Sequence, residues 1–364
     1  DPACGSGNFL TETYLSLRRL ENKVLRVLYG EGQGVLGIAA SDIIKVSIQQ
    51  FYGIEINDFA VTVAKTALWI AESQMLDETK NIIYGLNADF LPLKTYVNIT
   101  EGNALRMDWN SVIPANSLSY IMGNPPFLGY ALQSQSQKDD IKYIASNIDC
   151  KIGSNVDYVA MWYIKNTEIK CAFVSTNSIT QGEQVAVIWK PLFEKYDIAI
   201  DFAYQTFRWD SEANIKAHVH CVIIGFCHTG NSVKKILYSQ TGEKKEAQNI
   251  NPYLVDAPSV FIERRTKPIC DVPSIYRGSQ PTDNGNLILS KEEMEDLICK
   301  EPLSQKFIRP FMMGRDFINR EYRYCLWLEN ANPSEIKKCP SVMERIENVR
   351  EFRLKSKKAA TRKK

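Results

Sequence analysis

The sequence predicts an α/β fold for residues 1–250, with a doubly wound and mostly parallel sheet, followed by a C-terminal α+β region. Three observations support this prediction. A glycine-rich turn leads into a helical pattern, short apolar runs typical of strands end in polar residues, and the two kinds of run alternate up to about residue 250. Ligands bind at the carboxyl ends of the strands in such a sheet, so residues that follow a strand are the candidate functional residues.

The first element is the turn Asp-Pro-Ala-Cys-Gly-Ser-Gly at 1–7. Apolar residues then recur at helical spacing, which predicts an amphipathic helix over 9–28. Glycine lets the backbone approach a ligand closely, although an isolated Gly-x-Gly pattern is more often only structural. Cys4 is expected to be a small packing residue rather than a nucleophile.

The next two elements are strands that end beside polar residues. Residues 51–57, Phe-Tyr-Gly-Ile-Glu-Ile-Asn, predict a strand with Glu55 at its end, where a carboxylate in a doubly wound sheet binds ribose hydroxyls. Residues 98–102 lead like a strand into Asn103 and Ala104.

The tetrapeptide Asn124-Pro125-Pro126-Phe127 follows a fourth apolar run, residues 119–123, which predicts a strand that ends in glycine. The Asn124 side-chain oxygen and the Pro125 carbonyl can each accept a hydrogen bond, and Phe127 offers an aromatic face. Together they suit a flat base that carries an amino group. The alternative is an ordinary Asn-Pro turn with no function.

The remaining pattern continues the alternation of helices and strands. It predicts helices at 156–163 and 185–193, and strands at 171–174, 198–200 and 218–226. The polar residues 134–154 are expected to form a loop, either a mobile one beside the active site or a surface loop without function. Repeated prolines after residue 250 predict a domain boundary near that position.

Composition indicates a large intracellular globular protein. The chain has 364 residues, of which 45% are hydrophobic, enough to bury one large domain and a smaller one. No apolar run is long enough to span a membrane, and nine cysteines without a Cys-x-x-Cys pair indicate reduced thiols in the cytoplasm. The cluster His218, His220, Cys221, Cys227 and His228 lacks the spacing of a closed metal site, so no metal is predicted.

The net charge of +2 hides an uneven distribution. Residues 261–364 carry 22 basic against 15 acidic residues, hence +7, whereas residues 1–260 carry 22 against 27, hence −5. Lysine and arginine supply most nonspecific affinity for DNA. The basic surplus therefore favours contact with duplex DNA after residue 260, although the last dozen residues alone are more typical of a solvated charged tail.

The motifs DPACGSGNF, GIEIN, EGNAL at 101–105 and NPPF, in this order, resemble those of the gamma-type class I S-adenosylmethionine-dependent N6-adenine DNA methyltransferases. The phrases DPACGSGNFLTETYLSLRRLE, GNPPFLG, INPYLVD and RYCLWL are similar to MmeI-like restriction-modification enzymes, in which methylation and cleavage share one polypeptide. The resemblance covers most of the chain. It implies a seven-stranded class I sheet in 1–250, and a linker and the start of a DNA-recognition region in 251–364.

The resemblance also implies which residues bind S-adenosylmethionine. The turn at 1–7 surrounds the methionine part, Glu55 holds the ribose, and Ile56 and Asn103 border the adenine. Many relatives carry aspartate where Asn103 stands, and Ala-Asp-Phe-Leu at 88–91 competes for the same role. The full set of implied cofactor residues is Asp1, Ala3, Cys4, Gly5, Gly7, Glu55, Ile56, Asn103 and Ala104.

The implied catalytic residues are Asn124, Pro125, Pro126 and Phe127. Asn124 and Pro125 accept the two N–H groups of an adenine that has been flipped out of the duplex, and Phe127 stacks on it. Phe207 is the first candidate for a second aromatic wall and Trp209 the second, with a role in the core as the alternative for either.

Other functions stay open at this point. The same tetrapeptide suits methylation of an RNA adenine or of a protein glutamine amide, and a noncatalytic DNA-binding subunit could keep the fold. The chain starts without methionine, and the strand expected before the glycine-rich turn is missing, so we expect a fragment. Any nuclease domain and further recognition domain are expected outside it.

Overall fold

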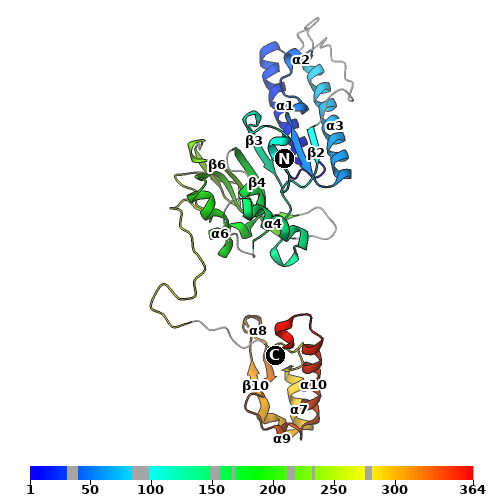
Figure 1. The fold of residues 1–364 in the computed structure, drawn as a ribbon, viewed down its shortest axis with the longest axis vertical. Coiled ribbons are helices and arrows are strands. Elements are labelled where there is room, and N and C mark those ends of the chain that lie inside the picture. Colours follow the sequence, from blue (N-terminus) through cyan, green and yellow to red (C-terminus); the bar gives the residue numbers. More distant parts are fainter. Residues whose placement is uncertain are drawn as a thin grey trace. The chain divides into compact units, whose positions relative to one another are not determined.

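The computed structural model describes residues 1–30, 40–83, 98–147, 156–165, 169–210, 218–231, 234–274 and 281–363 (Figure 1). Within them the chain forms two compact units, Asp1–Thr266 and Lys267–Lys364. Residues 251–266 stay with the first unit because they pack on its helix α6 (Gly182–Glu194). There the rings of Phe193 and Phe261 lie 6.0 Å apart, and Lys190 pairs with Glu263.

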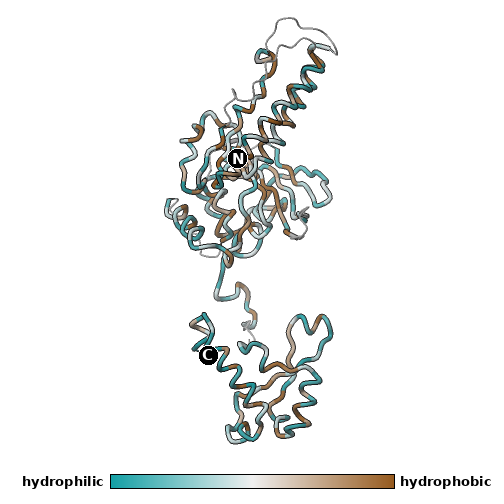
Figure 2. Tube along the Cα trace, turned by 90° about the vertical axis from the view of Figure 1, so that its right-hand side faces the viewer, coloured by the Kyte–Doolittle hydropathy of each residue, from teal (hydrophilic) through white to brown (hydrophobic). Residues whose placement is uncertain are grey.

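Two long helices, α1 (Asn8–Tyr29) and α3 (Asp58–Ile82), pack side by side in the first unit (Figure 1). Figure 2 shows hydrophobic residues recurring along both helices between hydrophilic ones, as the predicted helix over 9–28 requires. Arg18 is buried between them because Glu21 neutralises it and Thr79 accepts a hydrogen bond from it at 2.7 Å. The short helix α2 is Ala40–Ile43.

A two-stranded parallel sheet packs against α3. It consists of β1 (Tyr52–Glu55) and β2 (Asn98–Glu101), paired so that Glu55 lies beside Glu101. Both strands agree with the sequence-based prediction. Since they are parallel and in this register, their carboxyl ends lie at the same edge.

A six-stranded mixed sheet forms the centre of the first unit, in the order β3-β4-β6-β5-β7-β8. The pairs β3/β4 and β5/β7 are parallel, and the other three pairs are antiparallel. The strands are β3 (Tyr120–Gly123), β4 (Lys170–Thr176), β5 (Ile198–Asp210), β6 (His218–His228), β7 (Lys235–Tyr238) and β8 (Lys244–Ala247).

The described residues therefore do not form the single, mostly parallel sheet of seven strands that was expected. The α/β class is confirmed, but two sheets with equal numbers of parallel and antiparallel pairings replace the expected one. Short connections explain the antiparallel pairs β5/β6 and β7/β8. β5 ends at Asp210 and β6 begins at His218, and β7 ends at Tyr238 and β8 begins at Lys244, whereas a parallel crossover needs a dozen or more residues.

Three helices accompany this sheet: α4 (Gln135–Asn147), α5 (Ala160–Lys165) and α6. The prediction of a loop over 134–154 was wrong for residues 135–147, and residues 148–154 lie outside the described part. The polar composition concealed a helix that buries Ile141 and Ile144 and begins with a reciprocal pair, in which Ser134 and Gln137 bond each other's backbone N–H. The helix predicted at 156–163 begins only at Ala160.

The second unit has a three-stranded antiparallel sheet in the order β10-β11-β9, with helices around it. Its core is built from Leu289, Leu297, Phe307 and Leu326, with Cys339 and Val342 completing it. Its elements are β9 (Ile288–Leu289), α7 (Lys291–Lys300), β10 (Ile308–Phe311), α8 (Gly314–Asn319), β11 (Arg323–Leu326), α9 (Pro333–Ile336), α10 (Pro340–Lys355) and α11 (Ala359–Arg362). In both units together, no described helix is long and apolar enough to cross a membrane.

Short 3-10 helices complete the described structure. They are Ile48–Gln50, Trp109–Ser111, Ala115–Ser117, Tyr130–Leu132, Asn177–Thr180, Thr229–Asn231 and Pro302–Phe307.

Replacing Gly225 with alanine is expected to destabilise the central sheet. A Cβ at this position of β6 would lie 2.1 Å from the Phe202 ring on the neighbouring strand, so the ring or the strand must move. We expect the free energy of unfolding to fall by about 1–3 kcal/mol in urea denaturation. Gly230→Ala is the control, because its Cβ meets only His228 at 3.6 Å. Equal stability of both variants would contradict the steric argument.

Candidate functional site

The first residues of the chain bring the two sheets of the first unit together. The Asp1 amino group donates to Tyr52 O at 2.8 Å, and Ile54 N donates to Asp1 O at 3.0 Å, so Asp1 pairs with β1. On the other side, a Cβ built on Gly123 would lie 2.5 Å from Asp1 Oδ1. The glycine-rich turn therefore lies between the carboxyl ends of β1 and β3, next to Asn124.

Both glycines of the turn adopt a backbone conformation that favours glycine, and Gly7 also lacks room for a side chain. Gly5 and Gly7 have φ angles of 54° and 85°, a region that favours glycine. At Gly7 an added Cβ would also lie 3.0 Å from Ala64 on α3, whereas at Gly5 it would meet no atom within 4 Å. Cys4 is buried in the core below the turn, and burial raises the pKa of its thiol to about 11. This thiol is a packing group, as expected from the sequence.

Glu55 connects β1 to the glycine-rich turn. Its two carboxylate oxygens accept hydrogen bonds from Gly5 N at 2.9 Å and from Asn57 N at 3.0 Å. Asn57 in turn caps α3 by accepting from Ala60 N. Ile56, the next residue, is 68% exposed, which places an apolar side chain at the surface beside the carboxylate.

Asn103 and Ala104 follow β2 in a tight turn. The Asn103 side chain accepts from Leu105 N at 2.9 Å and donates to Asp140 at 3.1 Å. Ala104 is buried, and its carbonyl accepts from the Trp109 indole at 2.8 Å. The competing segment 88–91 lies outside the described residues.

Lys165 at the end of α5 fixes the next residues of this turn. Its Nζ donates to Leu105 O at 2.9 Å and to Met107 O at 2.6 Å. Burial lowers the pKa of Lys165 to about 8. The turn after β2 is therefore held by hydrogen bonds from Lys165 on α5 as well as by the Asn103 hydrogen bond within the turn.

The tetrapeptide directly follows β3. Pro125 is buried, Asn124 is half-buried, and Phe127 packs against the core of the six-stranded sheet, while Pro126 is exposed. Among the residues that the structure describes, none forms a hydrogen bond with the Asn124 amide or with the Pro125 carbonyl. Two polar groups at the carboxyl end of β3 are therefore available to a ligand.

Phe207 and Trp209 lie near the carboxyl end of β5. Phe207 pairs with Cys221 of β6, which pairs with Thr176, the last residue of β4. Both aromatic residues therefore lie at the same edge of the sheet as the end of β3. Their rings are 6.2 Å apart, and Trp209 is 39% exposed, so neither belongs to the deep core.

Two buried carboxylates near this edge were missed by sequence reasoning. Asp157 accepts hydrogen bonds from the hydroxyl of Thr176, the last residue of β4, and from that of Ser178 just beyond it. Asp140 on α4 bonds Asn103. No motif or spacing marks either residue, because a buried carboxylate is identified only by its partners in space.

No metal site emerges in the part of the chain that the structure describes, where no group of three or more His, Cys, Asp or Glu side chains could hold a metal ion. Cys221 and Cys227 are buried and His220 and His228 are exposed. The side chain of His218 lies outside the described residues.

Comparisons with known proteins agree along the whole chain. The family described as "MmeI, DNA-methyltransferase domain" matches residues 1–239, and "MmeI, target recognition domain" matches residues 256–364. DNA methyltransferase A of Bacillus subtilis (strain 168) is 42% identical over 371 residues, which cover 100% of this chain and 41% of the relative.

The structure of the type IIL restriction-modification enzyme MmeI in complex with DNA is also similar. It is 44% identical with a TM-score of 0.90, and the match covers 100% of this chain and 49% of that one. The chain therefore spans less than half the length of either relative.

Proposed function

Because the chain belongs to the MmeI family of DNA methyltransferases, with the family's methyltransferase and target recognition domains in order, we propose that it methylates duplex DNA. The methyl donor is S-adenosylmethionine, and the acceptor is N6 of an adenine that is flipped out of the duplex. We further propose that the reaction is the modification step of a restriction-modification enzyme. If the enzyme also cleaves DNA, we propose that the nuclease is a domain outside this chain.

The available amide of Asn124 is the observation that carries this proposal. Its oxygen and the Pro125 carbonyl follow β3 directly, and no described residue occupies either acceptor. An adenine amino group has two N–H donors and therefore matches two acceptors. A turn that served only to close the strand would not need an amide without a partner beside the glycine-rich turn.

The residues around that turn fit S-adenosylmethionine. Each Glu55 oxygen accepts one backbone hydrogen bond and keeps a lone pair for a ribose hydroxyl. Ile56 offers an exposed apolar face to the adenine, and the turn with Asp1 and Ala3 surrounds the methionine part. When bound, the cofactor supplies a methyl group on a positively charged sulfur, which is the electrophile of the reaction.

The chain's own contribution to the chemistry is orientation and polarisation. The lone pair of an adenine amine is delocalised into the ring, which makes the nitrogen a poor nucleophile. Hydrogen bonds from both N–H groups to Asn124 and Pro125 favour a more pyramidal nitrogen and direct its lone pair toward the methyl group. Phe127 stacks on the flipped base, and its contact with the core holds it in place.

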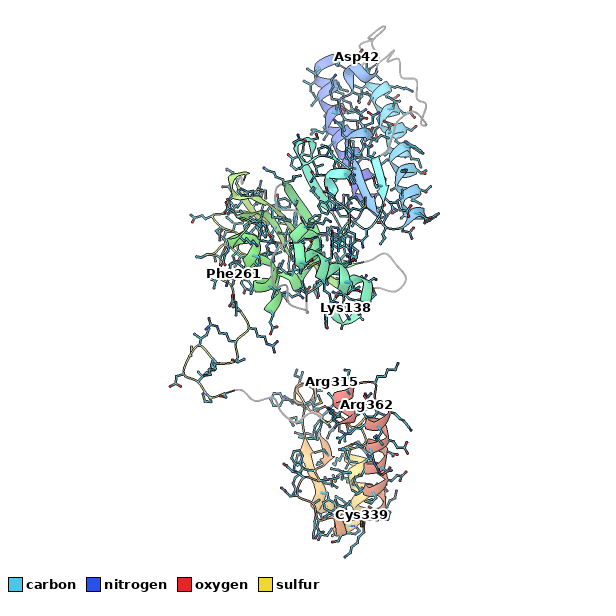
Figure 3. The ribbon with its side chains drawn as sticks, in the orientation of Figure 1. Asp42, Lys138, Phe261, Arg315, Cys339 and Arg362 are labelled. Atoms are coloured by element: carbon cyan, nitrogen blue, oxygen red, sulfur yellow. The ribbon has the colours of Figure 1, made fainter. Side chains whose placement is uncertain are left out.

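The second unit supplies a surface suited to the DNA backbone. Arg315 and Arg320 are exposed on and just after α8, beside exposed Phe317 and Tyr322. Figure 3 places Arg315 and Arg362 at the end of this unit opposite Cys339. Together with the charge of +6 over residues 267–364, from 20 basic against 14 acidic residues, this surface favours phosphate contacts. We also propose a cytoplasmic location, because scattered cysteines without a Cys-x-x-Cys pair are typical of reduced thiols.

Transfer of a labelled methyl group tests the proposed function. The full-length protein is incubated with labelled S-adenosylmethionine and, in separate reactions, with unmethylated duplex DNA, RNA or a protein that contains glutamine, and the modified group is identified after digestion. We expect the label in N6-methyladenine, and sequencing of modified bases in cells that express the protein would give the target motif. Label only in RNA or in a glutamine amide would overturn the proposal, as would a protein that binds cofactor and DNA but methylates no sequence.

Phe207→Ala is expected to impair use of DNA without changing cofactor affinity. Stacking of a base on an aromatic ring is worth about 1–3 kcal/mol, so kcat/KM for DNA should fall about tenfold. Trp209→Ala should have a smaller effect, because Phe207 is nearer to the carboxyl ends of β3 and β4. The control is Tyr120→Ala, which removes an exposed ring from the amino end of β3. An unchanged kcat/KM in Phe207→Ala would assign that ring a purely structural role.

A further inference from the structure

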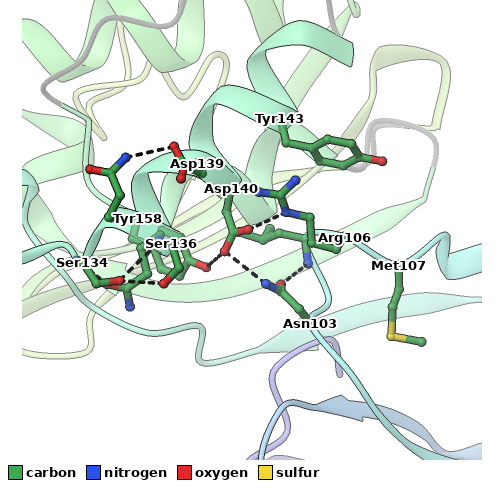
Figure 4. Close-up of polar contacts among 12 residues, drawn as sticks. Asn103, Arg106, Met107, Ser134, Ser136, Asp139, Asp140, Tyr143 and Tyr158 are labelled. Carbon is green, nitrogen blue, oxygen red and sulfur yellow. Dashed lines mark hydrogen bonds and ion pairs between the residues drawn. The ribbon is translucent and has the colours of Figure 1, made fainter.

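We propose that Asp140 is a positioning residue for the cofactor. It fixes the side-chain amide of Asn103, so that Asn103 offers one defined acceptor and one defined donor to the adenine of S-adenosylmethionine. The inference rests on the proposed function, because it requires that Asn103 borders the cofactor. Figure 4 shows the polar network that carries it.

Asp140 lies on α4, and its side chain is only 7% exposed. Its carboxylate accepts three hydrogen bonds: from Asn103 Nδ2 at 3.1 Å, from Arg106 Nε at 2.6 Å and from the Tyr158 hydroxyl at 2.6 Å (Figure 4). Burial and the bond to Asp140 raise the pKa of Tyr158, so its hydroxyl keeps the proton that it donates. The Arg106 guanidinium is held further by the Tyr143 ring, 4.6 Å from the ring centre.

These contacts determine which way the Asn103 amide faces. A carboxylate without a proton only accepts, and a backbone N–H only donates. The Asn103 nitrogen must therefore point to Asp140 and its oxygen to Leu105 N, as observed. Turning the amide over would place oxygen against oxygen and N–H against N–H. The network thus gives the amide a single orientation.

The fixed amide keeps the groups that an adenine edge requires. An asparagine side chain has two N–H donors and two oxygen lone pairs, and the network uses one of each. One donor and one acceptor remain, and adenine presents the complementary pair, an amino N–H beside a ring nitrogen. Hypoxanthine carries a carbonyl in place of the amino group, so an amide that cannot turn over should reject it.

Asp140 and Asn103 belong to different parts of the site. It belongs to the helix that follows the Asn124–Phe127 segment, whereas Asn103 follows β2 on the cofactor side. One carboxylate therefore ties the substrate side of the site to the cofactor side. An aspartate in place of Asn103 would offer only acceptors, so an orienting carboxylate has a purpose specific to asparagine at this position.

The neighbouring Asp139 provides a matched control. It lies on the same helix with a side chain that is 47% exposed. It accepts hydrogen bonds from Gln135 and Lys142, both within α4, and none from the turn after β2. Asp139→Asn therefore makes the same chemical change one residue away without touching Asn103.

The experiment compares binding of S-adenosylhomocysteine and its inosine analogue by calorimetry. We expect the wild type to prefer the adenine ligand at least about tenfold. Asp140→Asn should weaken binding of the adenine ligand about tenfold and bring the ratio of the two dissociation constants toward one, because an amide at 140 can donate as well as accept. Asp139→Asn should keep both values.

A structural role predicts a different result. If Asp140→Asn weakens both ligands by the same factor, or changes neither, the positioning role is overturned. If the wild type binds neither ligand, the proposed function itself fails, and the role of Asp140 fails with it. Thermal melting identifies a variant that does not fold.

Asn103→Ala keeps the test decisive in that case. It should lose the preference for adenine. Where Asp140→Asn does fold, the two variants should lose the preference to the same extent, and the double variant should differ from Asn103→Ala by less than about twofold. A preference for adenine that survives Asn103→Ala would overturn the proposal. A further loss of about tenfold in the double variant would show that Asp140 does not act through Asn103.

Discussion

Asn124→Ala is expected to reduce methyl transfer by about 100- to 1,000-fold, the usual cost of losing one polar group that acts on the reacting atoms in the transition state. The amide oxygen is one of two acceptors for the target amine, and no described residue occupies it. Affinity for S-adenosylmethionine should stay within about twofold, because the cofactor residues belong to other strand ends. The measurement is single-turnover methylation, with cofactor binding determined separately by calorimetry.

Asn116→Ala is the matched control, since it removes an exposed asparagine from the 3-10 helix Ala115–Ser117 before β3. Its methylation rate should equal that of the wild type. The role of Asn124 would be refuted by a cofactor affinity that falls as far as the rate does. It would equally be refuted by a rate that hardly changes.

Local patterns made most of the individual elements predictable. The strands at 51–57, 98–102 and 119–123 and the helix at 9–28 depend on residues close in sequence, and each is present. The order of the central sheet depends on pairing over long separations. β6 lies between β4 and β5, which no local pattern encodes, and a seven-residue connection after Asp210 decides its antiparallel direction.

The residues of the candidate site likewise differ in whether local sequence predicts them. Glu55 ends a strand and Asn103 and Asn124 follow strands, and polar residues at strand ends of an α/β fold are recognisable candidates from the sequence pattern alone. Asp140 was concealed in a polar stretch that was expected to be a loop. Only the helix and its contacts with Asn103, Arg106 and Tyr158 reveal a buried carboxylate that joins two parts of the site. The Ser134 and Gln137 pair was the one local signal of that helix.

Glu55→Ala should produce the complementary result to Asn124→Ala, a loss of cofactor affinity of about 10- to 100-fold. The carboxylate is expected to bind ribose hydroxyls, and it also holds Gly5 N and Asn57 N, so its removal loosens the glycine-rich turn. The methylation rate at saturating cofactor should fall much less than the affinity. Calorimetry with S-adenosylmethionine and single-turnover rates at two cofactor concentrations separate the two effects.

Two further variants test this prediction: Glu101→Ala is the control, and Glu55→Gln is an intermediate case. Glu101 occupies the matching register position at the end of β2 and is exposed, so its removal tests whether any carboxylate at this edge contributes. Glu101→Ala should leave cofactor affinity unchanged. Glu55→Gln keeps one acceptor for the Gly5 N–H but loses the charge and one acceptor, and its affinity should fall between wild type and Glu55→Ala. If Glu55→Ala binds the cofactor as tightly as Glu101→Ala does, the ribose is held elsewhere and Glu55 only shapes the turn.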